Sequence, residues 1–207
     1  MKLTTDVIAR RALEALNQVG LDGLTMRALA TDLGVAAPTL YWHVKNKQEL
    51  LDLMADRLTA ETADALEAPR RDESWQDWLV ALAGRMRAAM LRYRDGARVV
   101  AGAHTANPTA WRTVELTLRT LQDAGFGTLE AARTFPVLLH YTIGFTIEEQ
   151  ARAGAGYDRN PYEQGPRVDA ARYPLTAEVV GQLFDPDNFE YGLRIILAGM
   201  AAVSRPG

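Results

Sequence analysis

The chain has 207 residues, of which 48% are hydrophobic and 24% are charged, a composition typical of folded globular proteins and unlike that of disordered chains. It contains no cysteine, which excludes disulfides, thiolate nucleophiles and zinc sites built on cysteine. The net charge of −3 argues against a protein that simply coats nucleic acid. Because the N-terminus lacks the apolar segment of a signal peptide and no uncharged apolar run reaches the length of a membrane span, we expect a soluble cytoplasmic protein.

Three helices are predicted near the N-terminus. The first is indicated by an apolar stripe with a period of about 3.6 residues, and it ends at Gly20. The stripe consists of Val7, Ala12, Leu13, Leu16 and Val19. Thr25 is placed to cap a second helix, which Gly34 stops. Pro38 stands in the first turn of a third helix, where a proline is tolerated.

The rest of the chain is also predicted to be helical. Asn46 and Glu49 have the spacing of a capping box and open a longer helix that fades near Leu66. Residues 154–174, rich in Gly, Pro, Arg and Asp, are expected to form a flexible surface loop. No segment shows the alternation typical of a strand, so the fold class is all-α. Further helices are expected over 74–93, 97–103, 107–123, 128–152 (with a kink at Pro136), 176–184 and 188–203.

Residues 26–45 have the spacing of a helix-turn-helix. Ala30 is small enough to let two helices cross closely, and Gly34 takes a left-handed turn conformation at little cost. Leu40 is expected to fill the core between the two helices, with Val44 one turn further along on the same face.

The opposite face of this third helix carries the polar and aromatic groups. If Leu40 and Val44 face inward, Thr39, Trp42 and His43 point outward. Hydroxyl and imidazole groups bind phosphates, aromatic rings pack on sugars and thymine methyl groups, and lysines neutralise phosphate charge. In an arbitrary helical hairpin, the tryptophan and its neighbouring tyrosine would instead pack on another helix. The helix-turn-helix spacing favours a helix that lies in the major groove of DNA.

The stretch GLTMRALATDLGVAAPTLYWHVKNKQELL resembles the DNA-binding head of the tetracycline-repressor (TetR) family, and the likeness covers residues 5–54. The later stretches ESWQDWL, RDGARV and FDPDNFEYGLRIILAGM resemble parts of the tetracycline repressor's own subgroup. The resemblance implies an all-helical homodimer. Its three-helix DNA-binding head would span 1–46 and its larger helical ligand-binding and dimerisation domain 47–207, with a connecting helix over 47–66.

The resemblance carries the family's DNA-contacting positions to this chain residue by residue. The residues expected at DNA are Thr25, Arg27, Ala37, Pro38, Thr39, Tyr41, Trp42, His43 and Lys47. Two positions depart from the tetracycline repressor, since Met26 replaces a threonine and Ala37 replaces a glutamine. A two-fold dimer places its recognition helices about 34–36 Å apart, or a multiple of that, so the double-stranded operator is expected to be nearly palindromic. The dimer interface is expected on the helices at 128–152 and 188–203.

The effector site implied by the resemblance departs from that of a tetracycline repressor. Val100, Leu82 and Met86 stand where that subgroup has a metal-ligating histidine, a drug-binding asparagine and a phenylalanine. Glu148 matches the acidic residue that one subunit contributes to the metal-bound water of the other. We expect a largely apolar small-molecule effector of unknown identity, not tetracycline, and no metal or cofactor. The candidate ligand-binding residues are Leu82, Met86, Val100, His104, Trp111, Leu138, His140, Phe145 and Glu148.

Each apolar candidate is also compatible with ordinary core packing, and His140 with a hydrogen-bonded core histidine. No catalytic set competes, because the sequence has no Gly-rich phosphate loop, no HExxH motif and no nucleophile elbow. We predict a ligand-responsive transcriptional regulator, a repressor that leaves its operator when the effector binds, and not an enzyme. Two alternatives stay open. One is a small-molecule binding module without working DNA binding, and the other is a constitutive DNA-binding protein with a filled core.

The substitution Ala37→Gln tests the prediction that residue 37, at the start of the third helix, lies at the bases of the operator. Glutamine hydrogen-bonds base edges and alanine does not, so the variant is expected to prefer a different operator from the wild type. Selection of tight-binding duplexes from a random pool would measure both preferences. An unchanged preference would contradict the placement of residue 37 at the bases.

Overall fold

The computed structural model describes residues 2–105, 107–154 and 168–203. Every regular element in this part of the chain is a helix, which confirms the all-α prediction. No helix within these ranges is long and apolar enough to cross a membrane. Most of the predicted surface loop at 154–174 lies outside the described residues. The helices are α1 Thr5–Gly23, α2 Met26–Asp32, α3 Ala37–His43, α4 Lys47–Ala63, α5 Trp75–Leu91, α6 Gly96–Ala101, α7 Pro108–Asp123, α8 Thr128–Arg152, α9 Pro174–Val179 and α10 Asn188–Val203.

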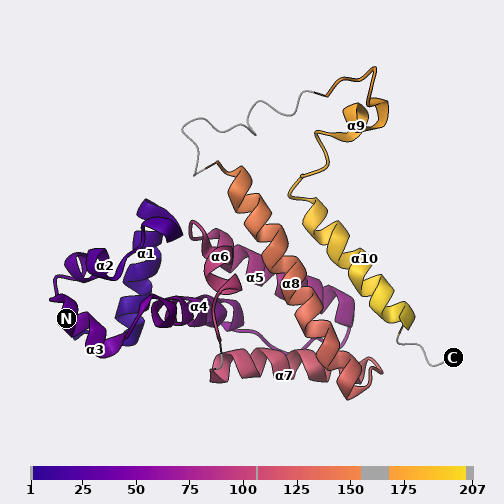
Figure 1. The fold of residues 1–207 in the computed structure, drawn as a ribbon. Coiled ribbons are helices and arrows are strands. Elements are labelled where there is room, and N and C mark those ends of the chain that lie inside the picture. Colours follow the sequence, from indigo (N-terminus) through magenta and orange to yellow (C-terminus); the bar gives the residue numbers. More distant parts are fainter. Residues whose placement is uncertain (1, 106, 155–167, 204–207) are drawn as a thin grey trace.

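The N-terminal head consists of α1, α2 and α3, and it packs on the first half of α4 (Figure 1). The predicted caps are present: the side chains of Thr25 and Asn46 accept hydrogen bonds from backbone N–H groups at 3.2 and 2.9 Å. The carboxylate of Glu49 reaches back to the N–H of Lys45 at 2.6 Å, one residue before the expected partner. These bonds satisfy N–H groups that would otherwise lack partners at the start of each helix.

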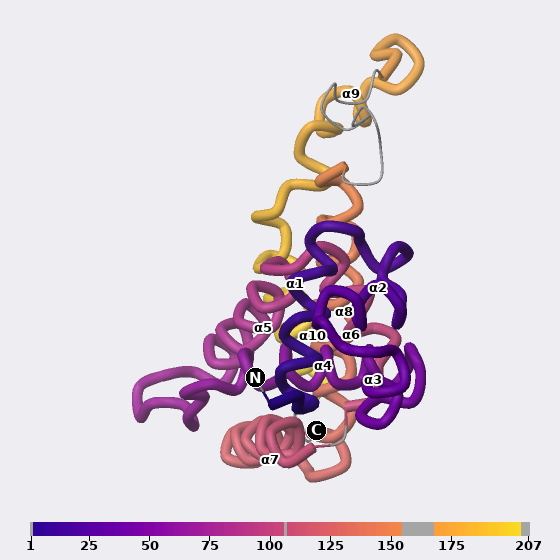
Figure 2. The backbone as a smooth tube through the Cα atoms, turned by 90° about the vertical axis from the view of Figure 1, so that its left-hand side faces the viewer, coloured from indigo at the N-terminus to yellow at the C-terminus, as the bar shows by residue number. Residues whose placement is uncertain are grey.

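The body is a bundle of α5 to α8 and α10, in which the long α8 lies beside α10 (Figure 1). The segment that holds α9 projects away from the bundle, as the view turned by 90° also shows (Figure 2). Gly192 lets α10 approach α8 closely, because a Cβ atom at this position would lie 2.1 Å from the hydroxyl of Tyr141. That hydroxyl donates to the carbonyl of Phe189 at 3.1 Å. Gly192 therefore packs inside the subunit.

Some predicted boundaries and faces differ from the structure. Val19 is 48% exposed instead of facing the core, because Gly20, with φ +67°, turns the chain away from the axis of α1. The connecting helix ends at Ala63, before Leu66. The helix expected at 97–103 spans Gly96–Ala101, and the one expected at 176–184 spans Pro174–Val179. Helix ends and short helices are set by neighbouring contacts as much as by local sequence.

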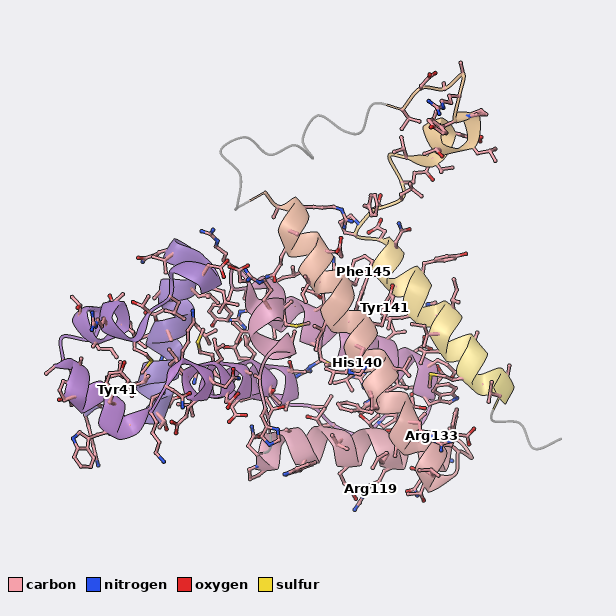
Figure 3. The ribbon with its side chains drawn as sticks, viewed as in Figure 1. Tyr41, Arg119, Arg133, His140, Tyr141 and Phe145 are labelled. Carbon is pink, nitrogen blue, oxygen red and sulfur yellow. The ribbon has the colours of Figure 1, made fainter. Side chains whose placement is uncertain are left out.

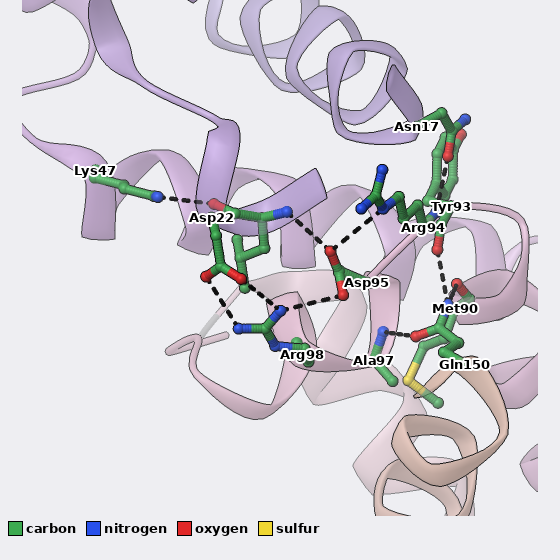
Figure 4. Close-up of polar contacts among 11 residues, drawn as sticks. Asn17, Asp22, Lys47, Met90, Tyr93, Arg94, Asp95, Ala97, Arg98 and Gln150 are labelled. Carbon is green, nitrogen blue, oxygen red and sulfur yellow. Dashed lines mark hydrogen bonds and ion pairs between the residues drawn. The ribbon is translucent and has the colours of Figure 1, made fainter. Parts of the chain in front are cut away.

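Head and body are joined by a polar cluster at the start of α6 (Figure 4). The carboxylate of Asp95 accepts a hydrogen bond from the backbone N–H of Leu21 at 2.9 Å and pairs with Arg98 at 3.2 Å. Arg98 also hydrogen-bonds Asp22 at 3.2 Å, which lowers the pKa of the Asp22 carboxyl. The ammonium of Lys47 donates to the carbonyl of Leu21 at 2.9 Å. The C-terminal end of α1 is thus held by both α4 and α6.

Gly96, the first residue of α6 after its turn, is predicted to be intolerant of a side chain. A Cβ atom there would lie 2.2 Å from the carbonyl oxygen of Met90, so Gly96→Ala should lower the free energy of unfolding by about 1–3 kcal/mol. Gly84→Ala is the matched control, since a Cβ atom at this site in α5 meets nothing within 4 Å. It should raise stability by roughly 0.5–1 kcal/mol. Urea unfolding at equal protein concentrations would measure both, and a Gly96→Ala variant as stable as wild type would contradict the packing of this turn.

Candidate functional site: a nucleic-acid interface and an apolar cavity

Helix α3, the predicted recognition helix, is held by buried apolar side chains and by the turn before it. Leu40 and Val44 are fully buried, as predicted. The turn closes with a hydrogen bond from the N–H of Val35 to the carbonyl of Ala30 at 3.0 Å, and Gly34 has φ +67°. This is the left-handed conformation that favours glycine. With its inner face fixed in this way, α3 has only one face left for solvent or a partner.

The outer face of α3 carries the predicted DNA-contacting side chains. Trp42 is 88% exposed and Tyr41 is 44% exposed. Thr39 and His43 are exposed beside them. Tyr41 lies at the far edge of the head, away from the bundle (Figure 3). A tryptophan this exposed does not pack on a neighbouring helix of its own chain, so the packing alternative for Trp42 does not hold.

The rest of the predicted DNA set lies around α3, with one exception. Thr25, Arg27 and Pro38 are exposed and Ala37 is partly exposed. Arg11 of α1 ties α2 in place through two hydrogen bonds to Asp32, at 2.6 and 3.0 Å. Lys47 is different, because its ammonium binds the carbonyl of Leu21 inside the chain. In this structure Lys47 holds the end of α1 and does not extend toward the outer face of α3.

The body contains an apolar cavity of about 270 Å³ between α4, α5, α6, α7 and α8. Helix α4 contributes Leu58, Thr59 and Thr62 to its wall, and α5 contributes Met86 and Met90. Its volume is near the lower end for ligand pockets, which are mostly apolar with a few polar groups. The arrangement is suited to a small molecule with a largely apolar surface.

The nine residues predicted to bind the effector do not all share this cavity. Met86, Val100 and Trp111 line it. Leu82 and Leu138 are buried in the neighbouring core of α5, α8 and α10. For Leu82 and Leu138 the choice of apolar residues was right about burial, but burial alone did not decide which neighbour each side chain faces. Leu82 and Leu138 are placed by ordinary core packing.

The four other predicted residues lie elsewhere. Phe145 packs on Phe189 of α10, with ring centroids 5.3 Å apart, and it points toward α10 in Figure 3. His140 is exposed, which also corrects its reading as a core histidine. Glu148 is exposed and pairs with Arg152 at 3.0 Å. His104 is exposed next to two lining residues, and its backbone N–H donates to Asp52.

Sequence reasoning missed a second apolar stripe on α8. Phe135, Leu139 and Ile143 line the cavity and recur every four residues, a spacing that would have identified them as one face. They were overlooked because α8 has another apolar stripe that faces α5 and α10. Thr62 and Thr113 also line the cavity. The sequence indicated them less clearly, because they are polar residues at positions that the helical period places inside.

The cavity wall offers no metal-binding chemistry. Its described residues include no histidine, aspartate or glutamate. Across the part of the chain that the structure describes, there is also no group of three or more such residues, or cysteines, that could hold a metal ion. The polar side-chain groups in the described wall are threonine hydroxyls and the indole N–H of Trp111.

Two family models match the chain. Residues 6–54 match the model described as bacterial regulatory proteins, tetR family, and residues 68–204 match the tetracyclin repressor-like C-terminal domain. The first match covers α1 to α3 and the start of α4, where the exposed recognition face lies. The second covers the helices that enclose most of the cavity.

Curated and solved relatives agree with these models over nearly the full chain. The tetracycline repressor protein class A from transposon 1721 of Escherichia coli is 40% identical, over 97% of this chain and 91% of its own length. A possible TetR family regulator from Streptomyces coelicolor A3(2) has a TM-score of 0.84 and 38% identity, over 96% of this chain and 99% of its own. A class A TetR in complex with 5a,6-anhydrotetracycline and magnesium has a TM-score of 0.69 and 34% identity, over 97% and 99%. The chain belongs to the tetR family of bacterial regulatory proteins.

Proposed function

We propose that this protein is a ligand-responsive transcriptional repressor that leaves its operator when a small, largely apolar molecule enters the cavity. The observation that carries the proposal is the fixed recognition helix, whose Trp42 is almost fully exposed on the face opposite the buried Leu40. Family membership supports it, since the relatives are named as repressors and regulators. A bacterial regulator that binds operator DNA acts in the cytoplasm.

The proposal divides the chain into a DNA-binding head at 1–46 and a ligand-binding and dimerisation domain at 47–207. The residues at DNA are those predicted from the sequence, except that Lys47 would have to leave the carbonyl of Leu21 to reach a phosphate. Arg27 and Lys45 are exposed near α3, and they supply positive charge for the phosphates without such a rearrangement.

A homodimer is supported by the exposed faces of α8 and α10. Tyr191 and Ile195 are 69% and 56% exposed, and Ala198, Gly199 and Ala202 continue the same face of α10. On α8, Val137 is 46% exposed and His140 and Gly144 lie on the same side. Small and apolar residues on two adjacent helices suit close packing with a second copy. Such a dimer presents two copies of α3 to a nearly palindromic operator.

Helix α4 is the proposed lever between effector and DNA. Its first half packs in the head core through Leu50 and Met54, and its second half lines the cavity with Leu58 and Thr62. The loop between α6 and α7 is also tied to α4: Gln48 donates to the carbonyl of Gly102 at 2.8 Å. Asn107 donates to Asp56 on the same helix. An effector changes the balance between two positions of this helix only by as much as it binds one position more tightly than the other.

Of the two alternatives, a constitutive DNA-binding protein requires a filled core. The cavity of about 270 Å³ favours a protein with room for an effector. A binding module without working DNA binding is disfavoured by the exposed aromatic face of α3, which would have no use in such a protein.

The proposal is tested on α3 with Trp42→Ala. Loss of the indole should weaken binding to a cognate duplex by roughly tenfold or more, since base and sugar contacts of this kind contribute about 1–3 kcal/mol. Thermal stability should not change, because the side chain is 88% exposed. Fluorescence anisotropy at two salt concentrations, with a duplex from beside the gene or selected from a random pool, would measure the affinity.

The matched control for this experiment is Tyr173→Ala. Tyr173 is another exposed aromatic residue, at 48%, and it directly precedes α9. Helix α9 lies far from the head (Figure 1). It should leave DNA affinity unchanged. If selected duplexes bind wild type and Trp42→Ala equally, the outer face of α3 is not the DNA-binding surface. If no duplex is bound selectively, the protein is a binding module and not a repressor.

A further inference from the structure

The cavity presents no charge to a ligand. Every described residue in its wall is uncharged, and the polar side-chain groups are the indole N–H of Trp111 and the hydroxyls of Thr59, Thr62, Thr105 and Thr113. Two arginines lie next to it in the fold, but their guanidinium groups bind backbone carbonyls and are not part of the wall. Arg85 donates to the carbonyl of Thr62 at 2.9 Å, and Arg112 donates to the carbonyl of Leu66 at 2.5 Å. An ionised group inside the cavity would therefore lose its hydration without gaining an opposite charge.

The hydroxyl groups of the wall are oriented by their own helices. Thr59 donates to the carbonyl of Ala55 at 2.9 Å, and Thr62 donates to the carbonyl of Leu58 at 3.1 Å. On α7, Thr113 donates to the carbonyl of Thr109 at 3.2 Å. Each hydroxyl has one hydrogen and two lone pairs. With the hydrogen committed to the helix, these three oxygens can only accept hydrogen bonds from a ligand.

The wall also fails to fit the magnesium that accompanies anhydrotetracycline in the solved class A TetR. Magnesium requires oxygen ligands in octahedral geometry and is usually bound through carboxylates. Here the described wall has neither carboxylate nor imidazole, and Val100 brings an isopropyl group into it. Glu148 is exposed, outside the wall, and paired with Arg152.

From these contacts we infer that the effector is an uncharged, metal-free molecule: an apolar ring system with at least one hydroxyl or N–H group that donates to the threonine oxygens. This inference rests on the proposed function, because it specifies the ligand of the same site. The inferred effector differs from 5a,6-anhydrotetracycline with magnesium, the ligand named for the solved class A TetR.

Three naphthalene derivatives of nearly equal size test the inference by calorimetry at pH 7. The first, 2-naphthol, is neutral and donates a hydrogen bond; 2-methoxynaphthalene is neutral without a donor; 2-naphthoate is an anion. We expect 2-naphthol to bind at least tenfold more tightly than 2-methoxynaphthalene, and at least a hundredfold more tightly than 2-naphthoate. Magnesium and EDTA should not change any of the three affinities.

Variants of the wall locate the binding. The triple variant Thr59→Val, Thr62→Val, Thr113→Val should abolish the advantage of 2-naphthol over 2-methoxynaphthalene, because valine keeps the shape and removes the acceptor. The matched control is Thr117→Val. Thr117 is a fully buried threonine of α7 with the same bond to its own helix, at 2.9 Å, but it lies outside the cavity wall. Met86→Trp should fill the cavity and prevent binding of all three probes.

Several outcomes would overturn the inference. They are equal or tighter binding of 2-naphthoate, no detectable binding of 2-naphthol at its solubility limit, or magnesium-dependent binding of tetracycline that Met86→Trp abolishes. Operator binding by the ligand-free protein, measured in parallel, distinguishes a failure of the inferred ligand class from a failure of the repressor function. If tetracycline with magnesium releases the operator, the ligand class is wrong and the repressor function stands. If no duplex is bound selectively but 2-naphthol binds as expected, the ligand class stands and the repressor function fails.

Discussion

The burial of α4 by head and body together is the constraint on which the rest of the structure depends. Leu50 and Met54 are fully buried in the core shared with α1, while Leu58 and Thr62, two turns further along, form part of the cavity wall. A helix is rigid over this length, since each turn is hydrogen-bonded to the next. A shift imposed at one end by a ligand must therefore be taken up at the other end, in the head core that also holds Leu40 and Val44 of α3.

The contacts around this helix differ in kind from one face to another. Near the head it is packed by apolar side chains, which are dense and tolerate little displacement. Another face of the same half of α4 is held by exposed or half-buried polar contacts, those of Gln48 and Asp52 with the loop that follows α6. Polar contacts at the surface exchange readily with water and contribute modestly to stability. The loop next to the cavity can thus rearrange at smaller cost than the packing of α1 against α4.

Helix α8 has three faces with different surroundings, and this explains its composition. One face closes the cavity with Phe135, Leu139 and Ile143. Another packs on α5 and α10, where the guanidinium of Arg87 lies 5.0 Å from the ring of Phe189 and pairs with Glu149 at 2.5 Å. The third face, with Val137 and His140, is exposed. Apolar residues around most of a helix indicate contacts on several sides, and the proposed second copy accounts for the last of them.

The sequence by itself determined the helices, their caps and the two faces of α3. Thr25, Gly34, Leu40 and Asn46 act locally or over one helical turn, so their roles follow from spacing alone. Its resemblance to the tetracycline-repressor subgroup also predicted, through Val100 and Met86, an effector site without the groups of a tetracycline site. The tertiary structure decided which apolar residues line the cavity and which fill the core. Helices α5 and α8 each bury more than one face, and periodicity does not identify the helix that each face contacts. It also decided the place of Lys47, whose ammonium is drawn to a carbonyl at the end of α1, distant in sequence and adjacent only in the fold.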